Sequence, residues 1–599
     1  MRERAPRMKT SSKKLRVAKS VDSNTGGQAK GESAPVRDEA REGGHSRRAF
    51  LGQLAGTAAA VAASDLALGR KAEAAQAGES LPSGAAPTGT YAPLGKETLI
   101  NRRLAAYDAR VARAKHWRDV NFSVQLANDD ELIYPEKFAN CSRMLPHDAL
   151  GHPDLESWNA LVSACNSGNP DDFNAIRLAL GGGRPLRNPQ GGFTFDLCGY
   201  DSHQTIIPPA PAFASARRAA EAVELYWAAL LRDVPFADWA TDPLVAQACA
   251  DLSKLSDYGG PTQGGVVTPN TIFRGPYPGC LNGPFVSQFL LKDVQFGSQP
   301  IVQRQRTFMP GIDYLTAYDK WLEIQNCGPF PPRVYDPVNR YIRSLRDGAT
   351  WVDADPPAQA GEWALLILLN SNTNAKIDAA NPYFNGQIIN QDAFTTFGPV
   401  EWFDMIGRAP RAAHVAGWFQ KWRIHRTLRP EEFGGRVHNH KIGAFSYPLH
   451  PEVLDSDAVA ETFKRQGTYL CSTAYPEGAP PHTSYPSGHS VGSGSTVAML
   501  KALFAETFIQ APVMPSADGL SLVPYEGPPL SVRGELNKLC WNIGWFRCAG
   551  GIHWRSDVVA GNTLGEQISI GIMRDMKALY NEPYAGYKLF KLDGTPIQI

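Results

Sequence analysis

Apolar side chains recur at three- and four-residue spacing in several long stretches of this chain, which is the pattern of amphipathic α-helices. Alternation of apolar and polar residues, the pattern of a half-buried strand, is rare. We therefore expect helices over residues 98–118, 213–231, 362–369, 399–425, 489–508 and 537–579.

Stretches rich in proline and glycine separate these predicted helices, for example residues 181–211 and 259–284. The chain holds 55 glycines and 46 prolines among its 599 residues, well above their usual share. Such turn-forming residues leave little room for regular structure. The predicted fold class is all-α: helical bundles that carry long Pro/Gly-rich loops, with two packed four-helix bundles expected.

The first 77 residues show the order of features of a bacterial twin-arginine export signal. A long basic segment precedes Arg47 and Arg48, an alanine-rich apolar run follows them, and small-residue triplets at 72–74 and 75–77 offer cleavage sites. A disordered basic tail is the alternative. With the leader removed by export to the periplasm or exterior, we expect an N-terminal helical half at 78–350 and a C-terminal helical bundle at 351–599.

The distribution of charge argues against a nucleic-acid partner. Residues 1–77 carry 15 Lys and Arg against 8 Asp and Glu, whereas the rest of the chain carries 45 against 51. A nucleic-acid-binding domain usually shows the reverse, a basic patch on its folded part. Outside the leader no apolar run approaches the ~20 residues of a membrane span. We expect neither a nucleic acid nor a membrane as a partner of the mature form.

Three segments in the last third of the chain combine histidines with cationic residues: 421–430, 482–490 and 547–557. In the second segment Pro486 and Ser487 lead directly into a helical pattern. The Ser487 hydroxyl and the Gly488 amide are therefore expected at a helix N-terminus, where free N–H groups and the positive end of the helix dipole favour an anion.

The first segment adds two cations. Pro430 is expected to end the helix that carries Lys421, because the residue before a proline is pushed out of helical geometry. Arg429 can then turn into the site, where its guanidinium offers a bidentate fork to a tetrahedral or trigonal oxyanion.

The third segment adds Arg547 and His553. On an unbroken helix their spacing would place them on different faces, but Gly550 and Gly551 interrupt it and let both point inward. His553 and Asp557 are four residues apart, so the carboxylate can accept from one imidazole nitrogen and leave the other as a lone-pair donor.

Taken together, the three segments resemble the vanadium-dependent haloperoxidases, which share their fold and anion site with the phosphatases of the type-2 phosphatidic acid phosphatase superfamily. The superfamily order is Lys, then Arg-Pro, then Pro-Ser-Gly-His, then Arg-x5-His-x3-Asp. In this chain it is present at Lys421, at Arg429 with Pro430, at residues 486–489, and at Arg547, His553 and Asp557.

Three details of the resemblance favour the algal-type bromoperoxidases over the phosphatases. Seven residues stand between Lys421 and Arg429, whereas the phosphatase pattern has six. Trp418 matches a tryptophan that lines the halide pocket of the haloperoxidases. His482 falls where the algal enzymes carry a second histidine and the fungal chloroperoxidases a phenylalanine.

The resemblance implies vanadate as the cofactor and His553 as the metal ligand. The residues that it assigns to the vanadate oxygens are Lys421, Arg429, Arg547, Ser487 and Gly488, the last through its N–H. Vanadium then acts as a Lewis acid toward hydrogen peroxide without changing its oxidation state.

The implied reaction oxidises bromide or iodide to hypohalous acid, which halogenates an organic acceptor. In it Lys421 polarises the peroxide, His489 transfers protons near neutral pH, and Asp557 supports His553. Trp418 and His482 form the halide pocket, and His482 tunes the halide step. The resemblance also implies a homo-oligomer.

Two other functions fit the same residues and stay open at this point. One is an acid phosphatase of the same superfamily that uses His553 as its nucleophile. The other is a non-catalytic protein that binds an anion in the same pocket.

Several conspicuous residues have plainer interpretations. Three histidines could suggest a metal site: His425, His438 and His440. We interpret them instead as loop or supporting residues, because acidic ligands are lacking around them. Trp422 and Trp545 fit core positions. Asp355 is either a carboxylate that pairs with a cation of the anion site, as in family members, or, more commonly for such a stretch, a solvated residue.

Overall fold

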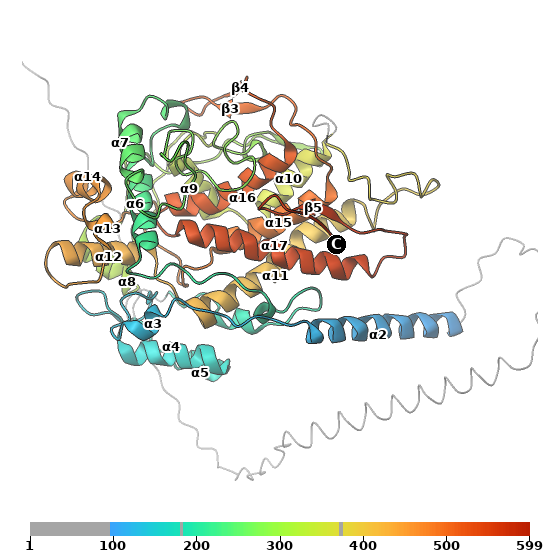
Figure 1. Cartoon of the computed structure of the whole chain (residues 1–599), viewed down its shortest axis with the longest axis horizontal. Coiled ribbons are helices and arrows are strands. Elements are labelled where there is room, and N and C mark those ends of the chain that lie inside the picture. Colours follow the sequence, from blue (N-terminus) through green and yellow to red (C-terminus); the bar gives the residue numbers. More distant parts are fainter. Residues whose placement is uncertain (1–95, 180–183, 371–374) are drawn as a thin grey trace, which may run out of the picture. The chain divides into compact units, whose positions relative to one another are not determined.

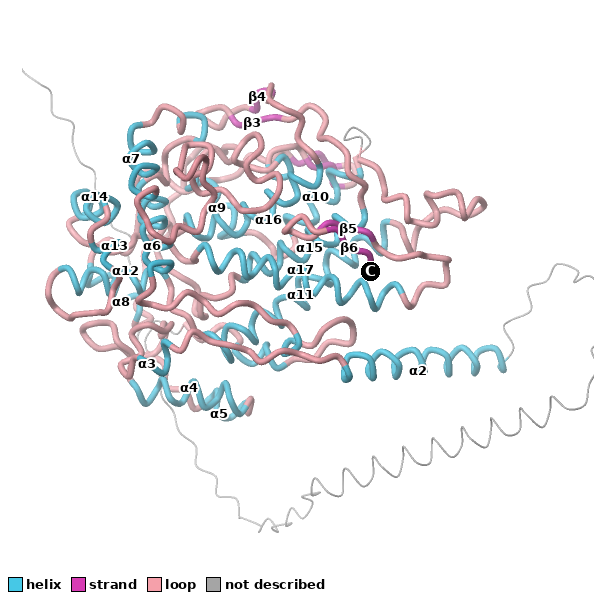
Figure 2. Tube along the Cα trace, in the orientation of Figure 1, coloured by secondary structure: helices cyan, strands magenta, loops and turns pink. Residues whose placement is uncertain are grey.

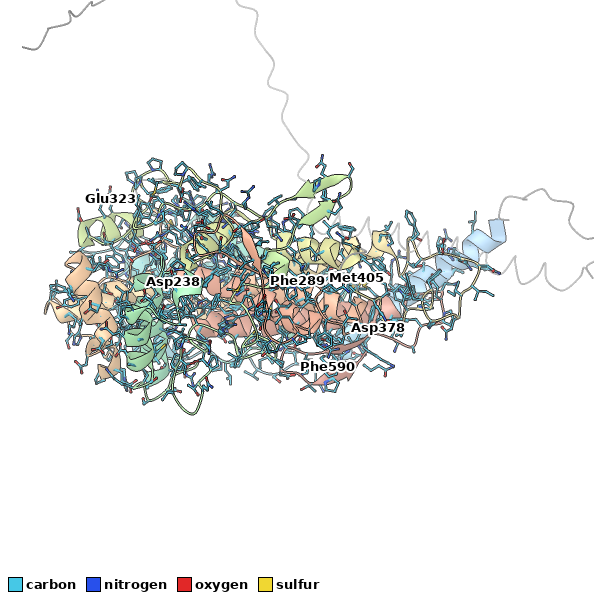
Figure 3. All side chains as sticks on the ribbon, turned by 90° about the horizontal axis from the view of Figure 1, so that it is seen from above. Asp238, Phe289, Glu323, Asp378, Met405 and Phe590 are labelled. Carbon is cyan, nitrogen blue, oxygen red and sulfur yellow. The ribbon has the colours of Figure 1, made fainter. Side chains whose placement is uncertain are left out.

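The structure is a computed structural model, and it describes residues 96–179, 184–370 and 375–599. The predicted export signal, with Arg47 and Arg48, lies outside the described residues. Residues Lys96–Ile599 form one compact unit. Side chains from both sides of the predicted boundary at residue 350 belong to one hydrophobic core, among them Phe289 and Met405, which Figure 3 labels.

Helices dominate the described residues, which confirms the predicted all-α class (Figure 1). Long loops connect them, as Figure 2 shows. The helices are α2 Lys96–Asp119, α3 Asp130–Ile133, α4 Leu155–Ser167, α5 Pro170–Asn174, α6 Ala216–Leu230, α7 Pro243–Leu252, α8 Tyr318–Gln325, α9 Leu345–Ala354, α10 Gln359–Leu369, α11 Pro399–Phe419, α12 Pro430–Lys441, α13 Pro451–Leu454, α14 Asp457–Gln466, α15 Gly488–Leu503, α16 Val532–Ala549 and α17 Arg555–Lys577.

Shorter elements complete the described chain. Three antiparallel pairs of strands are present, and in the first Val294 lies opposite Ile301. The strands are β1 Val294–Phe296, β2 Gln299–Ile301, β3 Val513–Pro515, β4 Leu522–Pro524, β5 Lys588–Phe590 and β6 Pro596–Gln598; the short 3-10 helices are η1 Pro189–Phe193, η2 Ser202–Gln204, η3 Phe236–Asp238 and η4 Gln288–Leu290.

The helix pattern over 537–579 corresponds to two helices, α16 and α17, and not to one. Gly550 caps α16, and Gly551 follows with φ +81°, a conformation that glycine adopts without steric cost. A Cβ on Gly551 would lie 2.5 Å from the Ser472 carbonyl oxygen, so the neighbouring backbone also requires glycine here. The break turns the chain sharply before α17 begins.

The central group of helices consists of α11, α15, α16 and α17, and α15 packs against each of the other three (Figure 1). Glycines let α15 and α17 approach closely. A Cβ on Gly494 would lie 2.3 Å from the Asn562 carbonyl oxygen, and a Cβ on Gly565 would lie 2.2 Å from the Val491 carbonyl oxygen. Backbone packs against backbone along this seam, which fixes the N-terminus of α15 relative to α17.

A second group of helices packs around α6 and contains α7, α12, α13 and α14. Ser215 caps α6 by accepting a hydrogen bond from the Arg218 N–H. The buried pair of Glu224 on α6 and Arg555 on α17 joins this group to the central one, with Arg555 Nε 2.8 Å from Glu224 Oε2.

Two further properties concern the hydropathy of the helices and the state of the cysteines. None of the helices in the described ranges is both long and apolar enough to cross a membrane. All nine cysteines lie within those ranges, and each is a free thiol.

Candidate active site

Lys421 enters the site from a π-helical turn that continues α11. The turn, η6, spans Gln420–His425, and the Arg426 N–H donates to the Lys421 carbonyl oxygen five residues back at 3.1 Å. Arg426 then takes the left-handed conformation, with φ 39°, and ends the helix. The wider turn is how the chain accommodates seven residues between Lys421 and Arg429.

Pro430 has a different role from the one predicted. It is the first residue of α12, where its missing N–H costs nothing, and the helix carrying Lys421 has already ended at Arg426. Arg429 is the cap residue of α12 and has an extended backbone. Its buried guanidinium lies in the site, as predicted, and donates to the carbonyl oxygens of His482 and Ile552.

Ser487 and Gly488 stand at the N-terminus of α15, as the sequence predicts. The Ser487 N–H donates to the Asp557 carbonyl oxygen at 2.9 Å, which ties this helix end to the first turn of α17. Gly561 lies beneath the same turn: a Cβ there would be 2.8 Å from the Ser487 carbonyl oxygen. Close packing against α17 therefore positions the helix end that would receive an anion.

The break between α16 and α17 brings Arg547 and His553 into the same site. His553 Nδ1 lies 2.7 Å from Asp557 Oδ2, and the same carboxylate oxygen accepts from the Trp554 N–H at 3.1 Å. His553 Nε2 accepts from Arg429 Nη1 at 2.9 Å. The imidazole therefore donates through Nδ1 and presents the Nε2 lone pair to the cations.

Three buried cations meet here without a carboxylate partner within 4.0 Å among the described residues: Lys421, Arg429 and Arg547. Lys421 Nζ donates to the carbonyl oxygens of Thr483 and Ser484 at 2.8 and 2.7 Å. Arg547 donates to the Val352 carbonyl oxygen, while its Nε is buried without a partner. The site thus holds more positive charge and more N–H donors than the surrounding protein satisfies.

The positive charge and the burial depress the basicity of the site. Burial lowers the pKa of Lys421 well below its usual value, and Arg429 and Arg547 lower it further. Burial likewise lowers the pKa of the His553 imidazole well below its usual value, and the same cations add to the effect. A buried oxyanion would reverse this repulsion, so the donor set fits an oxyanion such as vanadate or phosphate.

His482 and Trp418 lie together on one side of the cations. Their ring centroids are 5.0 Å apart, and the Lys421 Nζ lies 5.8 Å from the centroid of the Trp418 ring. Arg429 Nη2 donates to His482 Nδ1 at 3.0 Å. Burial and the charges of Lys421 and Arg429 lower the pKa of His482 well below its usual value, so this imidazole is neutral.

Asp355 is buried, whereas a residue in such a stretch of sequence is more commonly solvated. It follows α9, its side chain is 6% exposed, and its Oδ1 lies 3.0 Å from His489 Nε2. His489 is on the first turn of α15, directly after Gly488. A buried carboxylate thus orients the histidine nearest the anion-binding helix end, a position that the sequence could suggest but could not choose.

The other histidines and tryptophans that the sequence analysis singled out lie outside this site. His425 is in η6, and its Nε2 donates to Gln420 Oε1, while His438 and His440 lie on α12 and not in a loop. Trp422 and Trp545 are buried in hydrophobic clusters. Across the described residues, no group of three or more His, Cys, Asp or Glu is arranged to hold a metal ion.

One residue at the site escaped sequence reasoning. His414 lies on α11, four residues before Trp418 and seven before Lys421, a spacing that shares one helix face and could have revealed it. Its Nδ1 lies 2.6 Å from the Pro410 carbonyl oxygen. A Cβ on Gly488 would lie 3.3 Å from the Trp418 ring and 3.8 Å from His414 Nε2. His414 and Trp418 therefore form the wall beside the anion-binding helix end.

The fold and the site together define a helical protein with a buried oxyanion site, and the comparisons with known proteins agree. The family profile of the VCPO second helical-bundle domain matches residues 401–582. The vanadium-dependent bromoperoxidase of Ascophyllum nodosum is 33% identical over 512 residues, with 81% of this chain and 90% of that protein covered. The vanadium-dependent bromoperoxidase of Corallina officinalis is 31% identical, with 84% of this chain and 99% of that protein covered.

Solved structures give the same result. The homohexameric structure of the second vanadate-dependent bromoperoxidase from Ascophyllum nodosum superposes with a TM-score of 0.78 at 26% identity, covering 87% of this chain and 94% of that one. The chain belongs to the vanadium-dependent haloperoxidase family.

Proposed function

We propose that this protein is a vanadium-dependent bromoperoxidase: it uses hydrogen peroxide to oxidise bromide, and iodide, to hypohalous acid that halogenates organic acceptors. The observation that carries the proposal is the cluster of three buried cations without a carboxylate partner among the described residues, one of which, Arg429, donates to the Nε2 of His553. The bromoperoxidases among the relatives support the choice of reaction.

Each polar group of the site has a role in binding vanadate. Lys421, Arg429 and Arg547 supply positive charge and N–H donors to the oxygens of vanadate, and the Ser487 hydroxyl and Gly488 N–H add the helix end. His553 supplies the nitrogen ligand to vanadium. Bound vanadate supplies Lewis acidity toward peroxide.

Proton transfer falls to His489. Its Nε2 is held by the buried Asp355, which fixes the orientation of the ring for proton transfer. Lys421, whose Nζ donates to the carbonyl oxygens of Thr483 and Ser484 shortly before the helix end, would polarise a peroxide oxygen. His482 is neutral and faces Trp418, so together they bound the halide pocket without adding a charge.

A pair of assays on one purified preparation tests the proposal. Halide oxidation with peroxide and bromide that depends on added orthovanadate supports the bromoperoxidase. Hydrolysis of p-nitrophenyl phosphate that vanadate inhibits would instead identify an acid phosphatase with His553 as its nucleophile. Inactivity in both assays, with vanadate bound, would identify an anion-binding protein.

The proposal also includes assembly into a homo-oligomer and export from the cytoplasm. The homohexameric relative supports a homo-oligomer, which size-exclusion chromatography with light scattering would measure. Twin-arginine export to the periplasm or exterior rests on residues 46–77 alone. Replacing Arg47 and Arg48 with lysine should retain the protein in the cytoplasm, and unchanged export would contradict this assignment.

A further inference from the structure

A cavity lies on the outer side of the wall that Trp418 and His414 form beside Gly488. It has a volume of about 370 Å3 and is lined by Arg187, Asn188, Gly191, Thr194, Arg411, His414, Val415 and Trp418. The same two rings lie within 4 Å of a Cβ built on Gly488, at the helix end that would hold vanadate. The cavity therefore borders the place where hypohalous acid would form.

The lining of the cavity is positively charged and partly aromatic. No carboxylate belongs to it, while two guanidinium groups do. Arg411 forms an ion pair with Asp196. Arg187 is exposed, and no ion pair with a carboxylate is present for it among the described residues. The half-buried Trp418 ring offers a flat apolar face beside this free cation.

The backbone of Arg187 is fixed to both sides of the halide pocket. Its carbonyl oxygen accepts from Trp418 Nε1 at 2.9 Å, and its N–H donates to the Pro481 carbonyl oxygen, next to His482, at 2.8 Å. The loop that carries the free guanidinium is thus anchored to the residues that bound the halide pocket, which keeps Arg187 next to that pocket.

We propose that this cavity binds the organic acceptor, and that the acceptor is a small electron-rich aromatic anion, such as a phenol bearing a carboxylate. The carboxylate pairs with Arg187 and the ring lies against Trp418. This inference rests on the proposed function. In the step, hypobromous acid delivers bromine to the ring: the carbon–bromine bond forms as the bromine–oxygen bond breaks, and the displaced ring proton and the hydroxide leave as water.

Another cavity near the site fits this ligand less well. It has a volume of about 350 Å3, and its lining places the carboxylates of Asp353 and Asp355 beside Arg304 and Arg306, so its charge is mixed, whereas the lining of the first cavity contains no carboxylate. The same cavity holds Arg304, which is exposed like Arg187. Arg304 therefore provides a matched control for the loss of one surface arginine near the site.

A competition experiment tests the proposal. The vanadate-loaded protein receives peroxide, bromide and an equal mixture of 4-hydroxyphenylacetate and its neutral amide, and the ratio of brominated products is compared with that from reagent hypobromous acid. We expect wild type and Arg304→Gln to favour the acid by about threefold to tenfold over the reagent, as one partly exposed ion pair allows. Arg187→Gln should return the ratio to that of the reagent, and Arg187→Lys should keep part of the preference.

Binding without turnover provides a second readout. Titration of the vanadate-free protein with 4-hydroxyphenylacetate, followed by saturation-transfer NMR, should show affinity that Arg187→Gln weakens and Arg304→Gln does not. A reagent-like ratio in wild type, or a preference and an affinity that survive in Arg187→Gln, would overturn the inference. Absence of bromination would reject the proposed function instead, and the binding titration would still decide on the acceptor site.

Discussion

At the scale of single residues, His553 and His489 have separable tasks. His553 presents the nitrogen lone pair to the cations, whereas His489 is held by Asp355 at the edge of the site. His553→Ala should weaken vanadate binding by at least about a hundredfold, because the metal loses its protein ligand. His489→Ala should keep vanadate and lose about 10²- to 10⁴-fold in turnover, the usual contribution of a positioned acid or base.

Equilibrium dialysis with metal analysis, alongside steady-state halogenation, measures both properties. Stoichiometric binding of micromolar vanadate by His553→Ala would remove His553 from the ligand set. An equal loss of binding in His489→Ala would make that residue a structural one.

His482 provides a second prediction at this scale, which concerns the choice of halide. Bromide is easier to oxidise than chloride, so we expect the wild type to use bromide and iodide well and chloride poorly. His482→Phe removes the nitrogen that accepts from Arg429 and makes the wall opposite Trp418 drier, which strengthens the electrostatics inside. The ratio of chloride to bromide kcat/KM should rise by about threefold or more.

Steady-state kinetics with each halide at neutral pH provide the measurement. Two results would contradict the halide role of His482: chloride oxidation by wild type as fast as bromide oxidation, or an unchanged ratio in both His482→Phe and His482→Ala.

At the scale of secondary-structure elements, the seam between α15 and α17 supports the site. Gly561→Ala would place a methyl group 2.8 Å from the Ser487 carbonyl oxygen and 2.7 Å from the Ser490 Cβ. The N-terminus of α15 must then shift, so we expect weaker vanadate binding and a loss of about 1–3 kcal/mol in unfolding free energy.

Gly407 on α11 is the matched control, because nothing lies within 4 Å of a Cβ built there. Gly407→Ala should leave vanadate binding unchanged and stabilise the chain by up to about 1 kcal/mol through helix propensity. Urea unfolding and vanadate titration of both variants test the pair. Gly561→Ala with unaltered stability and affinity would show that the seam tolerates the displacement.

At the scale of the whole molecule, buried neutral histidines predict sensitivity to acid. Burial lowers the pKa of His425 to about 3. Between pH 6.5 and about 3 the unfolded chain therefore binds a proton at this position that the folded chain does not, so stability falls as pH falls. His425→Gln should remove about 1.4 kcal/mol per pH unit from that fall.

Unfolding free energies at pH 6.5, 5.5 and 4.5 for wild type and His425→Gln give the two slopes. His116→Gln is the control for the loss of one histidine, since His116 is exposed on α2. Identical slopes for all three proteins would mean that His425 takes up its proton in the folded state.

The sequence by itself determined the helical class and pointed to the residues that the fold brings together at the candidate site. Periodic apolar residues indicate the buried face of a helix. Few other sites require the combination of cations, hydroxyl and imidazole that occurs in order at Lys421, Arg429, Ser487 and His553. The glycines at 550 and 551 also marked the break between α16 and α17, because Gly551 takes a left-handed conformation that glycine adopts without steric cost.

Only the tertiary structure decided how these residues are positioned. The π-helical turn at Gln420–His425 and the start of α12 at Pro430 depend on packing, which local propensity does not encode. Asp355 joins His489 across 134 positions of sequence, and Arg187 meets Trp418 across 231 positions. Such contacts between distant segments arise when helix faces bury their apolar side chains together. The pattern of residues along the sequence therefore cannot specify them.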